Sequence, residues 1–394
     1  MNACNVKEML KNFYEDPCFF VDFHNVGRGI IGDGGGDKNQ SYIKSTKALN
    51  CWRIIGDELQ KVEDTNHGIL YDTETYILQW KFEYVADGTT HEDTLFYYWK
   101  GKNASKGHSP LPPEIEDKNP AVERICQWSE PALFFHMFSK RLIVFNGTHD
   151  KFNPNLKRLF MVRGELPSEI HLYEVPCSKE SLRSRGIFLL LNTSENMVYY
   201  WFGAAVPSEH QQIGSKIKLN TRNEHWANYG TVEVKDGYDD LFLKLLGDQT
   251  SSYVRFSSSA DFSPRLFYFS SITGNFLAIE VEYPLRSKRH KAAFPFLQSH
   301  LYTADQPALF LLDNGKEIWL WEGWKTSESS TELFEIELQL AKETASNYAK
   351  EKGHNLSIPV KHVLSGLEPL EFVNIFPYWN KRNDIAEVQL KNKH

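Results

Sequence analysis

A six-residue phrase that occurs three times constrains this chain more than any other feature of its sequence. The phrase consists of strand-forming apolar residues followed by Trp, any residue and Gly, and it stands at residues 96–101, 198–203 and 318–323. Its Trp residues, Trp99, Trp201 and Trp321, are 102 and 120 positions apart. That period is too long for a solenoid and suits one small domain per copy. We therefore predict one module used three times, with each Trp packed in a core rather than exposed for ligand stacking.

Two further phrases recur with the same period. Opening strands are predicted at 51–54, 158–162 and 265–269. A closing phrase, Glu-Pro followed by two Phe residues four positions apart, begins at Glu130 and at Glu368, with a looser version at 239–246. Residues four apart lie on one face of a helix, so each closing phrase predicts a short helix.

Each repeat also contains one strongly apolar run between its opening strand and its Trp-Gly phrase. These runs stand at 75–80, 187–191 and 309–312. Near-continuous apolar runs of this length are typical of central strands that are covered on both faces. Each repeat is therefore predicted to be a sheet between helices.

A long helix is clearest in the third repeat. Residues 331–351 lack Gly and Pro, and Gly353 follows as a C-cap signal. Four residues recur at helical spacing and predict its apolar stripe: Leu333, Ile336, Leu340 and Thr344. A shorter helix is predicted at 209–219 in the second repeat and another at 7–14 near the N-terminus.

The first repeat has prolines where a long helix would stand, at Pro110, Pro112 and Pro113. A proline in a helix interior costs about 3 kcal/mol. We therefore expect this helix to be missing or to begin after Pro113.

Composition and charge narrow the class of protein. The 394 residues are 41% hydrophobic and carry a formal net charge of −7, which supports real cores and argues against a dedicated nucleic-acid binder. The five cysteines have neither metal nor disulfide spacing, which favours a reducing intracellular compartment. No signal sequence or apolar stretch of transmembrane length is present.

Taken together, the phrases resemble the gelsolin-like repeats of the gelsolin/villin family. The residues that carry the resemblance most specifically are in the third repeat, at 264–267, 295–298, 306–311, 321–324 and 366–370. The resemblance implies an α+β fold of three gelsolin-like repeats, each a mixed five- to six-stranded sheet between a long and a short helix. We place the repeats at 48–150, 155–257 and 262–380, after a partly disordered segment 1–47 and before a tail 381–394.

The resemblance also implies a function. We expect a non-enzymatic protein of the actin cytoskeleton that binds or organises actin filaments, in the cytoplasm and at the actin-rich cell cortex, with the long-helix and closing-helix faces as candidate contacts. The usual C-terminal headpiece of villin-like proteins is missing, so we expect a fragment, a short isoform or a reduced relative. The alternative is a peripheral scaffold at the cortex that binds phosphoinositides or other cortical proteins and has no direct affinity for actin.

Gelsolin-like repeats usually bind calcium, through an Asp at the start of the central strand and a Glu on the long helix. That Asp position reads Glu74, Gly186 and Ala308 in the three repeats, so only Glu74 retains a carboxylate. Calcium requires several oxygen ligands. We therefore expect no cofactor and at most a degenerate calcium site at Glu74, whose other interpretation is a solvated strand-end carboxylate.

A basic run at 286–291 is the candidate patch for anionic lipid or an acidic partner, the other interpretation being a solvated loop. Its cations are Arg286, Lys288, Arg289 and Lys291. A glycine pattern at 27–32 fits a dinucleotide fingerprint, but the glycine-rich 33–37 that follows would not form the required helix. No constellation of nucleophile, base and orienting group supports an enzyme.

Overall fold

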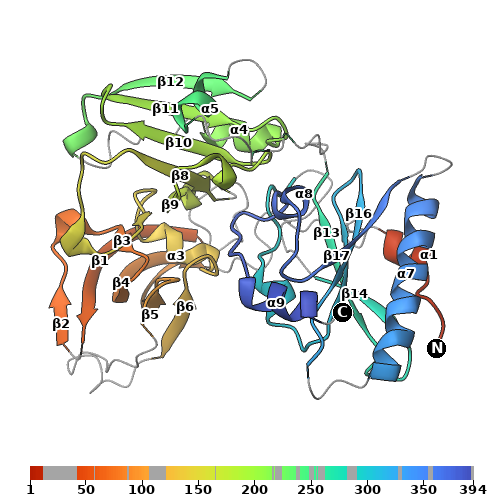
Figure 1. Cartoon of the computed structure of the whole chain (residues 1–394). Helices are drawn as coiled ribbons and strands as arrows, with labels where there is room; N and C mark the ends of the chain where they lie inside the picture. Colours follow the sequence, from red (N-terminus) through yellow and green to blue (C-terminus); the bar gives the residue numbers. More distant parts are fainter. Residues whose placement is uncertain are drawn as a thin grey trace.

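The computed structural model describes residues 1–11, 42–56, 58–86, 88–105, 121–164, 166–214, 217, 224–236, 240–247, 253, 255, 262–281, 291–326, 331–353 and 358–391. These residues form three mixed sheets, and a common five-strand order recurs in each (Figure 1). In that order the opening strand lies between a short strand and the central strand, and the Trp-Gly strand is followed by a last, parallel strand. The predicted α+β architecture of three repeats is confirmed.

The first sheet has the order β2-β1-β4-β5-β6. Its strands are β1 (Tyr42–Ile55), β2 (Glu58–Lys61), β4 (Thr75–Ala86), β5 (Thr89–Lys100) and β6 (Val122–Cys126). The opening strand starts before the predicted boundary at residue 48, because Tyr42 already pairs with Val85 of the central strand. The predicted N-terminal segment 1–47 is therefore too long at its C-terminal end.

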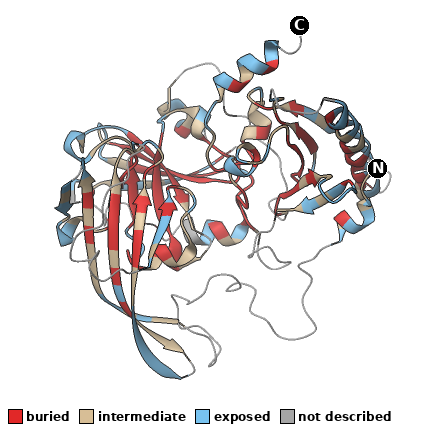
Figure 2. Ribbon diagram, turned by 90° about the horizontal axis from the view of Figure 1, so that it is seen from below, coloured by how far each residue is buried: buried red, intermediate tan, exposed pale blue. Residues whose placement is uncertain are grey.

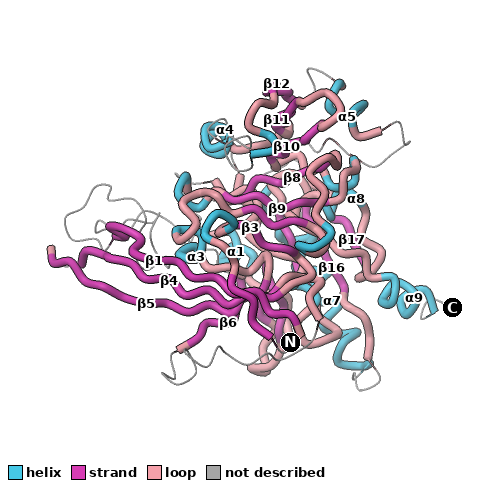
Figure 3. The backbone as a smooth tube through the Cα atoms, turned by 90° about the vertical axis from the view of Figure 1, so that its left-hand side faces the viewer, coloured by secondary structure: helices cyan, strands magenta, loops and turns pink. Residues whose placement is uncertain are grey.

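Strands β1, β4 and β5 run past their neighbours as a three-stranded arm (Figure 3). β2 pairs only with the end of β1, and β6 only with the end of β5. The tip of the arm is exposed over residues 89–93 (Figure 2). The central strand is longer than the predicted 75–80 because its pairing with β5 continues to Ala86 opposite Thr89.

The second sheet has seven strands in the order β12-β11-β10-β8-β9-β7-β3. Five of them form the second repeat: β8 (Arg158–Arg163), β9 (His171–Val175), β10 (Ile187–Asn192), β11 (Met197–Phe202) and β12 (Gly230–Lys235). The other two, β3 (Ile69–Tyr71) and β7 (Ile143–Phe145), come from the stretch predicted as repeat one. β7 pairs in parallel with β9, so one sheet crosses the predicted boundary between 48–150 and 155–257 and covers an edge that would otherwise be open.

The third sheet has the order β14-β13-β15-β16-β17 and is covered on both faces. Its strands are β13 (Arg265–Ser270), β14 (Leu277–Glu280), β15 (Leu309–Asp313), β16 (Ile318–Glu322) and β17 (Val360–Leu364). Along β15, Leu309 and Leu311 pack in the core under helix α7 (Thr331–Gly353), whereas Phe310 and Leu312 pack in the core under helix α8 (Leu370–Val373). This alternation confirms the prediction that the central strand is buried on both sides.

The long helix of repeat three is present, but its predicted apolar stripe is not the face that meets the sheet. The side chains buried against the sheet include Phe334, Leu338 and Ala341. Leu333 and Ile336, from the predicted stripe, are 41% and 51% exposed. The predicted stripe is thus only partly buried, since Leu340 and Thr344 are covered while Leu333 and Ile336 are exposed.

The remaining helices are short: α1 (Val6–Leu10), α3 (Ala132–His136), α4 (Ser208–Gly214), α5 (Leu241–Leu245), α6 (Ser299–Tyr302) and α9 (Asn383–Lys391). Helices α3 and α8 stand where the closing phrases predict them, and α4 begins where the second repeat predicts a helix. The proline-rich stretch of repeat one lies outside the described residues. Helix α9 occupies the predicted tail 381–394, where Gln389 donates to the carbonyl of Gly323 at 3.2 Å and so joins repeat three.

The Trp-Gly phrase owes its residue types to packing. Trp99, Trp201 and Trp321 are fully buried, as predicted. A Cβ on Gly101 or Gly203 would collide with a backbone carbonyl, that of Asp72 or Ser184, in the loop before the central strand. Only glycine lets the Trp-Gly strand approach this loop so closely.

Candidate functional site

Glu74 lies immediately before the central strand of repeat one, at the position where the family resemblance places a calcium ligand. Its Oε1 accepts from Nη1 of Arg53 at 3.2 Å and from the backbone N–H of His149 at 2.8 Å. Its Oε2 accepts from the hydroxyl of Tyr76 at 2.5 Å. Both oxygens therefore face donors, and the neighbouring positive charge is a guanidinium of the protein itself.

Asp72 lies two residues earlier and is held in the same manner. Its carboxylate accepts from the backbone N–H of Gly147 at 2.7 Å and from the side-chain amide of Asn103 at 2.8 Å. The ammonium of Lys102 lies 3.6 Å away, and burial lowers the pKa of Lys102 although Asp72 acts in the opposite direction. The loop before the central strand is therefore tied down by internal donors.

In repeat two the corresponding loop reads Arg183-Ser184-Arg185 before Gly186. It binds repeat three: Nε of Arg183 donates to the carbonyl of Phe376 at 2.8 Å, and Nε of Arg185 donates to the carbonyl of Ala293 at 3.0 Å. Burial lowers the pKa of Arg183 to about 10. The position that would hold a cation thus holds cationic side chains that join two repeats.

In repeat three the corresponding residue, Ala308, is buried, and its backbone N–H is bonded to the side chain of Gln306 at 3.1 Å. Across the described part of the chain, no three His, Cys, Asp or Glu side chains are grouped so that they could hold a metal ion. A calcium site at Glu74 therefore stays an untested prediction, and its geometry shows a carboxylate already engaged by donors.

The closing phrases have a structural role that their spacing does not reveal. The indole Nε1 of Trp99 donates to Glu130 at 2.8 Å, and that of Trp321 donates to Glu368 at 2.9 Å. Repeat two lacks the Glu-Pro pair, and the buried Nε1 of Trp201 finds no acceptor among the described residues. The two phrases are therefore joined by an indole–carboxylate hydrogen bond in repeats one and three, whereas in repeat two the ring of Trp201 stacks on that of Phe242 with the centroids 5.7 Å apart.

The outer flank of α7 carries the exposed apolar surface of the long helix. Leu333, Ile336 and Leu340 follow one another along this flank at helical spacing, and Thr344 continues it by one turn. The first two are exposed, Leu340 is half-buried, and Thr344 is fully buried. We call these four residues the α7 flank.

Thr344 is buried because the N-terminal residues 1–11 pack beside it (Figure 1). The backbone N–H of Cys4 donates to Oγ1 of Thr344 at 3.0 Å. Met9 of α1 is 5% exposed and belongs to the core between α7 and the third sheet. The sequence predicted a short helix here at 7–14 but gave no sign that it packs on repeat three.

Most of the predicted basic patch, Arg286, Lys288 and Arg289, lies outside the described residues. Lys291 is described and is half-buried. The patch therefore stays a prediction. None of the described helices is both long and apolar enough to span a membrane.

Repeats one and three also touch directly. The rings of Trp128 and Tyr378 stack with their centroids 5.3 Å apart, and the ammonium of Lys102 lies 4.8 Å from the Tyr378 ring. These contacts, with the arginines of repeat two, join all three repeats into one packed body.

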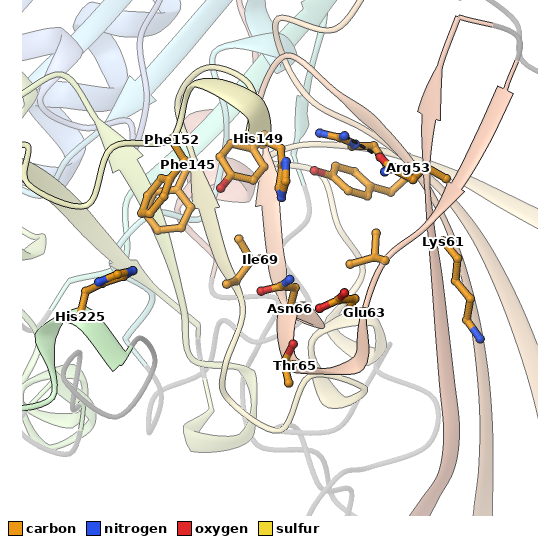
Figure 4. A pocket seen from close by; sticks show the side chains of 14 residues that line it. Arg53, Lys61, Glu63, Thr65, Asn66, Ile69, Phe145, His149, Phe152 and His225 are labelled. Carbon is orange, nitrogen blue, oxygen red and sulfur yellow. Dashed lines mark hydrogen bonds between the residues drawn. The ribbon is translucent and has the colours of Figure 1, made fainter.

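A cavity of about 850 Å³ opens beside Arg53 between repeats one and two (Figure 4). His149 lies near Arg53, whereas His225 stands apart on the side of repeat two. Arg53 is already paired with Glu74 and, at 3.3 Å, with Asp150, so its charge is not available to a ligand. The cavity is therefore an inter-repeat cleft to which we assign no ligand.

Comparison with known proteins identifies the repeats. A family model described as Gelsolin repeat matches residues 172–219. Supervillin from Bos taurus is 32% identical over 93% of this chain, and the aligned region is 18% of that relative. Protovillin from Dictyostelium discoideum is 24% identical over 84% of the chain and 34% of the relative, and advillin from Mus musculus is 26% identical over 88% and 40%.

This chain thus spans well under half the length of each of these relatives. A solved complex of the Thorarchaeota protein 2DGel3 with rabbit actin matches 51% of this chain and all of that chain at 18% identity, with a TM-score of 0.19, which is too low to support an argument. The sequence matches and the recurring five-strand order agree on the same module. The chain is a supervillin-like gelsolin-repeat protein of the gelsolin/villin family.

Proposed function

We propose that this chain is a non-enzymatic protein of the actin cytoskeleton that binds actin filaments, with little or no control by calcium. The proposal rests on family membership, because gelsolin-like modules bind actin through the long helix. The observation that carries it is the exposed pair Leu333 and Ile336 on the 23-residue helix α7. Exposed apolar side chains on the outer face of a helix are the usual anchors of a helix-mediated contact.

Weak calcium control is supported by the loops before the central strands. Glu74 faces Arg53, the second repeat has Gly186, and the third has Ala308. To bind at Glu74, a calcium ion would have to displace a guanidinium and two further hydrogen-bond donors. Few neighbouring carboxylates could supply its remaining oxygen ligands. Filament binding is therefore expected to be the same with calcium and with chelator, and to place the chain in the actin-rich cortex of the cytoplasm.

The test is co-sedimentation of the full chain with filamentous actin, with calcium and with chelator. Ile336→Asp is expected to weaken binding at least about tenfold, because it places a charge at the centre of an apolar contact. The matched control is Ile55→Asp, since Ile55 is 48% exposed, close to the 51% of Ile336, and lies at the end of β1 in the first sheet, opposite Glu58 of β2. Equal loss in both variants, or binding only with calcium, would contradict the proposal.

Failure of every form to pellet would favour the alternative, a scaffold without direct affinity for actin. In that case, the basic run at 286–291 would be tested for binding to phosphoinositide vesicles.

A further inference from the structure

The N-terminal segment, residues 1–11, packs on repeat three. Repeat one begins at β1, yet α1 lies beside α7 at the other end of the chain's three repeats (Figure 1). Its contacts include the hydrogen bond from the N–H of Cys4 to Thr344, one of 3.5 Å from the Cys4 thiol to the carbonyl of Phe276, the burial of Met9, and a hydrogen bond of 3.2 Å from Nη2 of Arg265 to the carbonyl of Lys11. We call this docked segment, residues 1–11, the N-terminal clasp.

The clasp covers one end of the α7 flank and leaves the other end open. Thr344 is fully buried beneath Cys4, and Leu340, one turn earlier, is half-buried. Leu333 and Ile336 continue the same stripe and remain exposed. A partner that follows this stripe along the helix therefore meets the clasp after about two turns.

Release of the clasp is expected to cost less free energy than the opening of a core element. Helix α1 has only five residues, and isolated helices of that length are not stable in water. Met9 is its single fully buried side chain, while Cys4, Val6 and Leu10 are half-buried. Short segments with few buried contacts open locally at a lower cost than the fold as a whole.

Thirty residues separate Lys11 from Tyr42, so release of the clasp does not require unfolding of repeat one. The length of this connection allows the clasp to leave α7 while both of the elements it joins stay folded.

We propose that residues 1–11 are an intramolecular clasp that competes with the actin filament for the α7 flank. This inference rests on the proposed function, because it assigns the same flank to the filament. The chain with the clasp docked binds weakly, and the chain with the clasp released binds more tightly. The affinity then scales with the fraction of molecules in which the clasp is open.

The test uses the full chain and two readouts. Clasp docking is read from the alkylation rate of Cys4 by iodoacetamide, resolved by mass spectrometry of its peptide, because burial raises the pKa of the Cys4 thiol and shields it. Filament affinity is read by co-sedimentation. Met9→Ser removes the anchor, and Lys7→Ser is the matched control because Lys7 is exposed on the same helix. Leu10→Ser is a second, milder release variant.

With Met9→Ser we expect Cys4 to react at least about fivefold faster and filament affinity to rise by a similar factor, with no change for Lys7→Ser. Equal Cys4 reactivity in the wild type and in both release variants would show that no docked clasp exists and would overturn the proposal. Faster Cys4 reaction with unchanged affinity would overturn the competition and leave the proposed function intact. Absence of filament binding in every form would refute the proposed function and the competition together, while Cys4 would still report docking.

Discussion

The coupling between the Trp-Gly phrase and the closing phrase can be measured by one substitution made in two repeats. Trp321 and Trp201 are both fully buried and stand at the same place in the repeat. Nε1 of Trp321 donates to Glu368 at 2.9 Å, whereas Nε1 of Trp201 finds no acceptor in the described structure. Trp→Phe therefore removes a similar ring volume from both cores and a hydrogen bond from only one.

The magnitude follows from these two terms. Removal of the fused ring leaves a cavity that costs about 2–3 kcal/mol in either repeat. Trp321→Phe also loses a hydrogen bond to a carboxylate, worth about 1.5–3 kcal/mol. The hydroxyl of Tyr302 still donates to Glu368 at 2.6 Å, which places the loss at the lower end. We expect Trp321→Phe to destabilise its repeat by about 2 kcal/mol more than Trp201→Phe destabilises its own.

Hydrogen exchange resolved by mass spectrometry gives the opening free energy of β11 and β16 separately, so neither repeat needs to unfold alone. Trp99→Phe is a further comparison, since Trp99 donates to Glu130 and should behave as Trp321 does. A cost at Trp201 as large as that at Trp321 would refute the assignment of stabilising energy to the indole-carboxylate bond.

Three further predictions concern charged side chains elsewhere in the chain. Burial raises the pKa of Glu130 above its ordinary value of 4.5, so the free energy of unfolding falls as the pH rises from 4.5 through the pKa of Glu130 in the folded protein. Glu130→Gln is therefore expected to be more stable than the wild type at pH 7 and to lose that advantage below pH 4.5, as measured by denaturant unfolding. Arg183→Lys removes the Nε donor to the carbonyl of Phe376 and is expected to cost about 1.5–3 kcal/mol, read as faster protease cleavage between repeats two and three; unchanged cleavage would contradict a role of Arg183 in joining these repeats. Under the alternative scaffold function, charge reversal of Arg286, Lys288 and Arg289 is expected to abolish binding to phosphoinositide vesicles, and unchanged binding would indicate a solvated loop.

Local patterns predicted the module well. The Trp-Gly phrase, the apolar central strands and the closing helix α8 lie where the sequence places them, because each depends on neighbours close in the chain. The predicted stripe of α7 is exposed at Leu333 and Ile336, whereas Ala341 and Ala345 are buried in the core against the sheet. The spacing of apolar residues in the sequence did not indicate which face of α7 packs on the sheet.

The candidate site was only partly predictable. Glu74 was singled out from its position, but its partners Arg53 and His149 come from an opening strand and from a turn 75 residues later in the chain. Arg183 and Arg185 carried no signal at all, because the acceptors that join them to repeat three are backbone carbonyls. Backbone acceptors leave no trace in residue type.

The sequence by itself determined three copies of one gelsolin-like module and the residue types that each copy needs, because strand alternation, helix period and close glycine approach act over short distances. Only the tertiary structure decided how the copies share a sheet through β7 and β9, which flank of α7 stays exposed, and that residues 1–11 cover part of it. Those outcomes depend on the shapes of surfaces that meet from distant parts of the chain, and such shapes exist only once the chain has folded.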